Sequence, residues 1–373
     1  MKDEAPSTVS QAAAPPTGTN PGGTRPLAYS YWLGTFIWRG SVAPRILIDV
    51  MIFGFISLLV TFSIQWWQRH YSVNLTVASG PFQAAGAVLG LLLVLRVNAG
   101  YDRWWEARKL WGGIVNQSRN LAVIGLTRGL PDPEWRSQFI SYVAAFPHVT
   151  RRSLREQRNL PELERLLSGE QRNEIARAMH MPGEVTTRIS ELLCEAQRGG
   201  MDGFAYSRAE EQRGKLIDHL GGCERIRATP LARGSAILVR QFIFVYLMTL
   251  PMAMLSLFED AGVIKGPNID GGLVIGGGAF DYHVLAVPIG VMLLAFMLLS
   301  LDRIGMELQN PFDTRRVDFL PLDNLCTMIE KNMLELLHRH PHISVTVPGV
   351  DQVELPPDAM HPNPDDFRSI DVS

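Results

Sequence analysis

Residues 81–112 constrain this chain more than any other stretch. Residues 82–95 carry no charge, and polar and aromatic residues then continue at helical spacing from Arg96 onward. From Arg96 to Trp111, Gly100 is the only residue that disfavours a helix. The pattern predicts one long helix that leaves a membrane and runs on into water.

The charge-free half of this helix is short for a span that faces lipid, which requires about 20 apolar residues. Ser79 is a candidate N-cap, followed by Gly80 and by Pro81 at the first helical position. The small residues in this half are Ala84, Ala85, Gly86, Ala87 and Gly90. Because small residues let helices approach closely, the helix suits the centre of an assembly better than its lipid-facing rim.

The composition fits a chain that is part membrane and part water-exposed. Its 373 residues are 46% hydrophobic with a mean hydropathy of +0.06, which is high for a soluble protein and low for one made entirely of spans. The formal charge of −2 gives no net basic field, so nucleic-acid binding has no support. Three scattered cysteines form no CxxC pair and predict neither a disulfide framework nor a zinc site.

Hydropathy and helical spacing predict an all-α membrane protein with four spans and a helical cytosolic domain. The spans are expected at residues 46–67, about 81–97, 237–258 and 283–301. The predicted division is a disordered tail at 1–28, an interfacial segment with the first two spans at 29–101, a cytosolic helical domain at 102–235, the third and fourth spans at 236–301, a cytosolic helical segment at 302–340 and an extended or disordered tail at 341–373.

Basic residues set the expected orientation, because the cytoplasmic loops of membrane proteins carry excess Lys and Arg. The two short loops hold few bases, mainly Arg69 and Lys265, whereas the segment between the second and third spans is dense in Arg. Both termini and the large domain are therefore expected in the cytoplasm. Asp49 lies one turn beyond Arg45, where an i,i+4 ion pair is expected and a functional intramembrane carboxylate is the alternative.

Residues 98–112, NAGYDRWWEARKLWG, resemble the signature that follows the pore helix in bestrophins, especially in their bacterial branch. Residues 38–41 (WRGS), 223–226 (CERI) and 307–312 (ELQNPF) agree in the same order. The resemblance covers roughly residues 32–337. The residues that carry it are Asn98, Asp102, Arg103, Trp104, Trp105, Glu106, Asn310, Pro311 and Phe312.

The resemblance implies a homopentameric ion channel in a bacterial inner membrane, in which five copies of the second helix line one axial pore. It places a hydrophobic neck at Ala87, Leu91 and Leu95. Independently, these three positions share one helical face, and rings of apolar side chains can gate a pore by dewetting. The alternative is that this face packs against another helix of the same subunit.

The ions expected to pass through the channel are small and monovalent. Five helix N-termini at Ser79, Gly80 and Pro81 would favour chloride or another anion. Because no ring of Lys or Arg lines the apolar stretch, cation conduction remains open.

No cofactor or resident metal is expected. Calcium-gated relatives follow Asn-Pro-Phe with an acidic run, but here only Asp313 and Asp318 flank two arginines, which is a poor set of calcium ligands. The alternate histidines His338, His340 and His342 could bind zinc, although a solvated tail is the favoured interpretation.

The sequence shows no P-loop, GxSxG, HExxH or GxGxxG motif, so an enzyme is not expected. A secondary transporter is the first rival to the channel, and it predicts inverted repeats and spans broken near the middle of the membrane. A membrane scaffold or sensor is the second rival, and it predicts no current.

Overall fold

The computed structural model describes residues 41–71, 77–229, 233–260 and 285–339. The tails at 1–28 and 341–373, together with His340 and His342, lie outside the described residues. Every regular element in the described ranges is helical, which confirms the predicted all-α class.

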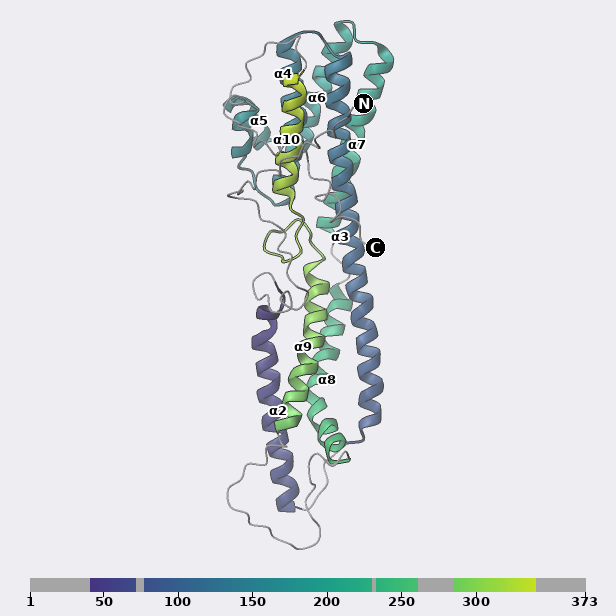
Figure 1. Ribbon diagram of the computed structural model, residues 1–373, viewed down its shortest axis with the longest axis vertical. Helices are drawn as coiled ribbons and strands as arrows, with labels where there is room; N and C mark the ends of the chain where they lie inside the picture. The colour runs from purple at the N-terminus through teal and green to yellow at the C-terminus, as the bar shows by residue number, and fades with distance from the viewer. Residues whose placement is uncertain (1–40, 72–76, 230–232, 261–284, 340–373) are drawn as a thin grey trace, which may run out of the picture. The chain divides into compact units, whose positions relative to one another are not determined.

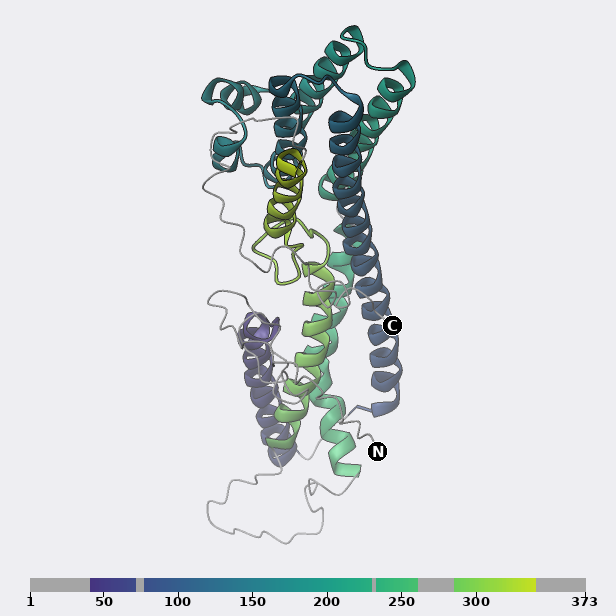
Figure 2. The ribbon, with the colours of Figure 1, turned by 45° about the horizontal axis from the view of Figure 1, so that its top comes forward.

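Four helices are long and apolar enough to cross a membrane, and they coincide with the four predicted spans. They are α2 (Ala43–Tyr71), α3 (Ser79–Arg128), α8 (Arg233–Asp260) and α9 (Ala286–Glu307). Helices α8 and α9 lie between α2 and α3 (Figures 1 and 2). Their shared core includes Leu93, Leu247, Leu250, Val291 and Ala295.

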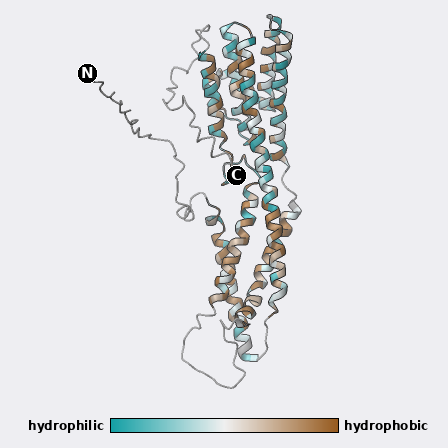
Figure 3. Cartoon of the chain, turned by 45° about the vertical axis from the view of Figure 1, so that its right-hand side comes forward, coloured by the Kyte–Doolittle hydropathy of each residue, from teal (hydrophilic) through white to brown (hydrophobic). Residues whose placement is uncertain are grey.

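The remaining helices form a second, more polar part. They are α4 (Pro133–Leu154), the short 3₁₀ helix η1 (Pro161–Arg165), α5 (Gly169–Arg177), α6 (Met181–Arg198), α7 (Gly203–Ala228) and α10 (Leu322–Arg339). Colouring by hydropathy separates these helices from the apolar group (Figure 3). A large core packs them around residues such as Trp111, Phe139, Phe146 and Leu216.

Helix α3 joins the two parts without a break, as its sequence predicts. Gly100 does not interrupt it, and at Gly100 the backbone of α3 lies close to the end of α9. A Cβ atom at Gly100 would lie 3.1 Å from the backbone oxygen of Gly305 and 3.2 Å from Cβ of Leu308. The glycine therefore serves close packing between helices rather than a turn.

Candidate ion pathway

Helix α3 leaves one apolar face open along its first half. Leu91 and Leu95 are 61% and 56% exposed, and Ala87, one turn earlier, is exposed as well. Leu89 and Leu93 point the other way and are buried in the membrane core. Within the described chain, the three predicted neck positions therefore share an unpacked face.

The open faces of α2 and α3 differ in character. Only 11% of the apolar stretch of α3 is buried, compared with 28% for α2, 39% for α8 and 28% for α9. The open side of α2 carries the large side chains of Leu47, Ile48, Met51, Ile52, Phe55 and Leu59. The open side of α3 begins with the small residues Ala84, Ala85 and Ala87 and continues with Val88, Leu91, Val94 and Leu95. The small side chains at its start suit close contact with other helices.

The open face of α3 becomes polar beyond Leu95. Asn98 and Asp102 are exposed and follow Leu95 at one and two turns on the same side of the helix. Ions leaving the apolar stretch along this face would meet an amide and then a carboxylate.

The N-terminal end of α3 begins one residue earlier than the cap prediction implied. Ala78 occupies the N-cap position, and no side-chain hydrogen bond caps the helix. Ser79 and Gly80 are already helical, so the prediction of Ser79 as the cap is wrong. The first backbone N–H groups are left without a side-chain partner, which together with the helix dipole favours an anion at this end.

Arg103 of the signature ties α3 to two distant segments. Its guanidinium donates to the backbone oxygens of Thr229 at 2.8 Å and Gln309 at 3.3 Å, and also to that of Ile226. Thr229 and Ile226 lie at the end of α7, and Gln309 follows α9. Three of the family-like stretches, which are far apart in sequence, therefore meet around one side chain.

The neighbouring signature residues also fix α3 in place. Trp104 Nε1 donates to the backbone oxygen of Asp318 at 2.9 Å, and Glu106 forms an ion pair with Arg225 of α7. The ring of Trp105 lies 6.5 Å from that of Trp104. The two tryptophans thus pack against neighbouring groups rather than stand free.

Glu307, the first residue of the ELQNPF stretch, is fully buried at the end of α9. It accepts hydrogen bonds from Arg45 at 2.7 Å, from Arg303 at 2.9 Å and from the backbone N–H of Val317 at 3.1 Å. The expected pair between Arg45 and Asp49 is therefore wrong, since Arg45 turns toward Glu307, 262 residues away.

The rest of the stretch forms a tight turn after α9. Asn310 Oδ1 accepts from the backbone N–H of Phe312 at 3.3 Å, and Pro311 O accepts from the N–H of Leu320 at 2.8 Å. Phe312 is buried in the core of the polar part. This turn links α9 to α10.

The acidic residues that follow the turn, which the sequence predicts to be a poor set of calcium ligands, include one that is paired with arginine. Arg315 donates to both carboxylate oxygens of Asp313 at 3.0 Å, and these hydrogen bonds lower the pKa of Asp313. Burial, followed by the nearby charge of Glu307, raises the pKa of Asp318. Among the described residues, no group of three or more His, Cys, Asp or Glu side chains is placed to hold a metal. His338 is exposed in the last turn of α10.

A buried charge cluster lies just beyond the apolar stretch of α3. Nη1 of Arg96 is 2.5 Å from Oδ1 of Asp302 on α9, and Nε of Arg240 on α8 is 3.4 Å from the other oxygen of that carboxylate. Asp302 is 6% exposed. Sequence reasoning missed this cluster, although a charged residue at or near the end of an apolar span is the signal that could have revealed it.

The fold and this geometry define a helical membrane protein with four candidate spans, one of which continues into a polar helical part. Residues 24–264 and 279–335 match the family described as "Bacterial/Fungal Bestrophin protein". The chain belongs to this family, which confirms the resemblance seen in its sequence.

Its relatives carry a shared description, "voltage-dependent anion channel-forming protein". The protein mll4386 of Mesorhizobium japonicum is 31% identical over 82% of this chain and 89% of its own length. The protein alr2987 of Nostoc is 31% identical over 85% and 95%. YneE of Escherichia coli strain K12 is 28% identical over 82% and 91%.

Solved structures agree with the fold. A crystal structure of a bacterial bestrophin homologue from Klebsiella pneumoniae matches with a TM-score of 0.66 at 23% identity. The match covers 79% of this chain and all of the other.

Proposed function

We propose that this chain is one subunit of a homopentameric channel that passes small monovalent ions passively, with anions favoured. The observation that carries the proposal is the open apolar face of α3, a helix that α8 and α9 separate from α2 (Figure 1) and whose apolar stretch is only 11% buried. The small residues Ala84, Ala85 and Ala87 at the start of this face favour a further helix as the partner that covers it. Copies of α3 around an axis supply such a partner.

In this arrangement Ala87, Leu91 and Leu95 form the neck. Ala87 gives a wide ring, so Leu91 and Leu95 carry the barrier to water and ions. Ser79, Gly80 and Pro81 present helix N-termini at the outer entrance, where the dipole attracts anions. The descriptions of the relatives as anion channel-forming proteins support the same sign of charge.

In the pentamer, Asp102 would form a ring of carboxylates on the cytoplasmic side, and such a ring favours cations over anions. The selectivity of the channel for anions therefore needs a direct test. Recording from the purified protein in a planar bilayer under a salt gradient gives the reversal potential. A reversal potential near that of chloride supports the proposal. A reversal potential near that of the cation would support a channel but contradict its proposed preference for anions.

We place the protein in a bacterial inner membrane with both termini and the polar part in the cytoplasm. The support is the Arg-rich composition of the segment between α3 and α8. Cysteine labelling from each side of spheroplasts tests this orientation, for example with Arg208→Cys on the exposed surface of α7 in a chain whose three native cysteines are replaced.

A transporter is less well supported, because α3 runs unbroken through the apolar half and Gly100. A current that saturates with ion concentration, as a carrier's does, would favour the transporter. The absence of any current would favour the scaffold or sensor.

A further inference from the structure

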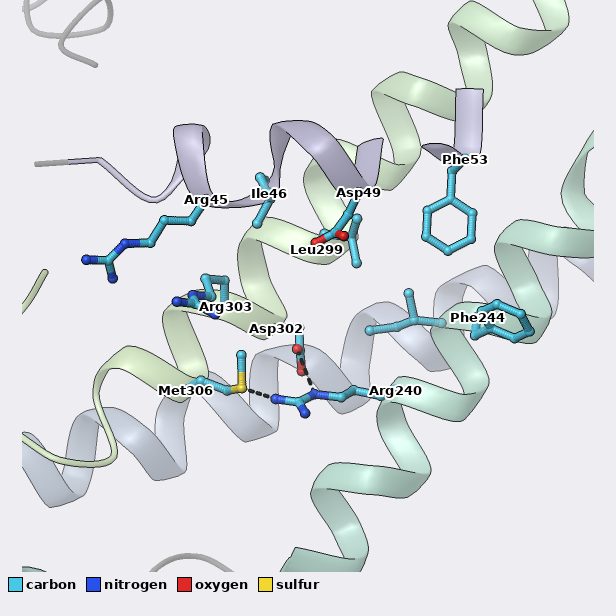
Figure 4. A pocket seen from close by; sticks show the side chains of 11 residues that line it. Arg45, Ile46, Asp49, Phe53, Arg240, Phe244, Leu299, Asp302, Arg303 and Met306 are labelled. Carbon is cyan, nitrogen blue, oxygen red and sulfur yellow. Dashed lines mark hydrogen bonds and ion pairs between the residues drawn. The ribbon is translucent and has the colours of Figure 1, made fainter. Parts of the chain in front are cut away.

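A cavity of about 460 Å³ lies between α2, α8 and α9, near the end of the membrane half that adjoins the polar part. Arginine side chains reach it from all three helices (Figure 4). Its lining comprises Arg45, Ile46, Asp49 and Phe53 of α2, Arg240, Ile243 and Phe244 of α8, and Leu299, Asp302, Arg303 and Met306 of α9.

The polarity of this cavity changes along the membrane helices. Arg45 and Arg303 lie toward one end, whereas Phe53 and Phe244 lie at the other, with their ring centroids 6.2 Å apart (Figure 4). The eight residues from position 45 to position 53 of α2 correspond to about 12 Å of helix. The cavity thus offers a charged end at the membrane boundary and an aromatic end about two turns deeper.

The charged end of the cavity is rich in arginine side chains that are partly exposed. Arg45, Arg240 and Arg303 line the cavity with side chains 35%, 51% and 33% exposed. Three carboxylates oppose them. Glu307 accepts hydrogen bonds from Arg45 and Arg303, Asp302 is paired with Arg96, and Asp49 is exposed. With Arg96 included, four arginines face three carboxylates, which leaves an excess of one positive charge.

Arg240 has weak acceptors for a guanidinium at this depth. Its Nε lies 3.4 Å from Asp302, and one terminal nitrogen contacts the thioether of Met306. A thioether is a poor acceptor, and charged groups near a bilayer are usually paired. A phosphate oxygen would be a far better partner.

Another face of α2, on the other side of the helix from the cavity, carries a shallow apolar groove of about 480 Å³ lined by Leu47, Ile48, Met51, Ile52 and Phe55. Large apolar side chains on this face suit contact with lipid, so lipid is available at the helix that forms one wall of the cavity.

We propose that this cavity binds an anionic phospholipid of the cytoplasmic leaflet. The phosphate lies against the three arginines, and one acyl chain lies along the aromatic end. This ligand matches the cavity in charge, in polarity gradient and in depth, as basic pockets between membrane helices do for anionic headgroups. The inference uses the proposed orientation but not the channel activity.

The test is native mass spectrometry of the full-length protein in detergent, titrated with phosphatidylglycerol or with phosphatidylcholine of the same acyl chains. We expect preferential retention of phosphatidylglycerol. Arg240→Gln should weaken it about fivefold, the effect of removing one basic charge at an anionic surface. Asp49→Asn should strengthen it, because it removes one of the opposing carboxylates. Arg208→Gln, on the exposed surface of α7, is the matched control and should change nothing.

Three results would overturn the inference. Equal retention of the two lipids, or equal loss in Arg240→Gln and Arg208→Gln, would show that the cavity does not select the headgroup. Displacement of the lipid by millimolar inorganic phosphate would show a site for a soluble anion instead. A density map of the protein in phosphatidylglycerol nanodiscs with polypeptide in the cavity would assign the space to the chain itself.

Discussion

Arg96 and Asp302 form a buried ion pair between α3 and α9, with 2.5 Å between Nη1 and Oδ1, immediately after the last position of the proposed neck. Their side chains are 9% and 8% exposed. The pair therefore fixes the proposed pore helix to its neighbour at the level where α3 changes from apolar to polar. Removing one partner from such a pair leaves an uncompensated buried charge, which is more costly than losing the attraction itself.

Asp302→Asn should destabilise the protein by roughly 3–5 kcal/mol, because Arg96 loses its carboxylate and Arg240 loses one of its acceptors. Thermal unfolding followed by the fluorescence of the tryptophans measures this as a lower midpoint. Glu211→Gln breaks exposed pairs on α7 and is the control for charge removal. An unchanged midpoint in Asp302→Asn would show that the pair contributes little.

The double variant Leu91→Ala and Leu95→Ala should raise the open probability, because smaller side chains widen the neck and lower the cost of wetting it. Single-channel recording in a bilayer measures the effect. Leu93→Ala is the control on the same helix. Leu93 is fully buried, so its truncation should cost about 2–5 kcal/mol of stability while the neck keeps its leucines. Gating unchanged in the double variant would rule out these leucines as the barrier.

Calcium at micromolar concentration should leave the current of the purified protein unchanged. Arg315 donates hydrogen bonds to both carboxylate oxygens of Asp313, and burial raises the pKa of Asp318, which favours its neutral form. These groups do not supply the several ionised oxygens that calcium requires. Recording with buffered calcium, against the same solution containing a chelator, checks this. A current that depends on calcium would refute it.

The sequence predicts the spans of this protein well but not the contacts that join them. A charge-free run such as residues 82–95 is a local property, and the helix it predicts is the helix found. The partner of Arg45 is different, because Asp49 is near in sequence while Glu307 becomes near only after α2 and α9 have packed. Arg96 and Asp302 are likewise far apart in sequence and meet only after α3 and α9 have packed. Helical periodicity predicts that Ala87, Leu91 and Leu95 share one face of α3 but not that this face is exposed, and the arginine-lined cavity exists only once three helices are placed together.

Gly100 illustrates how a residue that weakens a helix in sequence can be required by packing. Gly100→Val should destabilise the protein by roughly 1–3 kcal/mol, because a side chain there meets the backbone oxygen of Gly305 and Cβ of Leu308. Gly221→Val is the matched control, since nothing lies within 4 Å of a Cβ atom at that helical position. Comparing the two unfolding midpoints separates packing from helix propensity. Equal unfolding midpoints for the two variants would show that the close contact between α3 and α9 at Gly100 contributes nothing to stability.

Glu330 links α10 to the rest of the polar part, and its environment predicts a specific acid sensitivity. The carboxylate is 3% exposed and accepts hydrogen bonds from Nε2 of His148 at 2.8 Å and from Arg165 at 2.8 and 3.0 Å. Burial alone would raise the pKa of Glu330, but the bonds from His148 and Arg165 outweigh it and hold the pKa below its ordinary range.

Because the folded state binds a proton at Glu330 less readily than the unfolded state does, the carboxylate stabilises the fold above the ordinary glutamate pKa of about 4.3. That contribution should be lost as the pH falls further, through the lower pKa of the folded state. Unfolding midpoints measured between neutral pH and about pH 3 should therefore drop steeply in the native chain. Glu330→Gln should cost roughly 1–3 kcal/mol at neutral pH and flatten the drop, because glutamine has no proton to gain. Glu335→Gln removes the same charge from an exposed pair on α10. If Glu330→Gln shows the same acid profile as Glu335→Gln, the buried carboxylate is not the group that titrates.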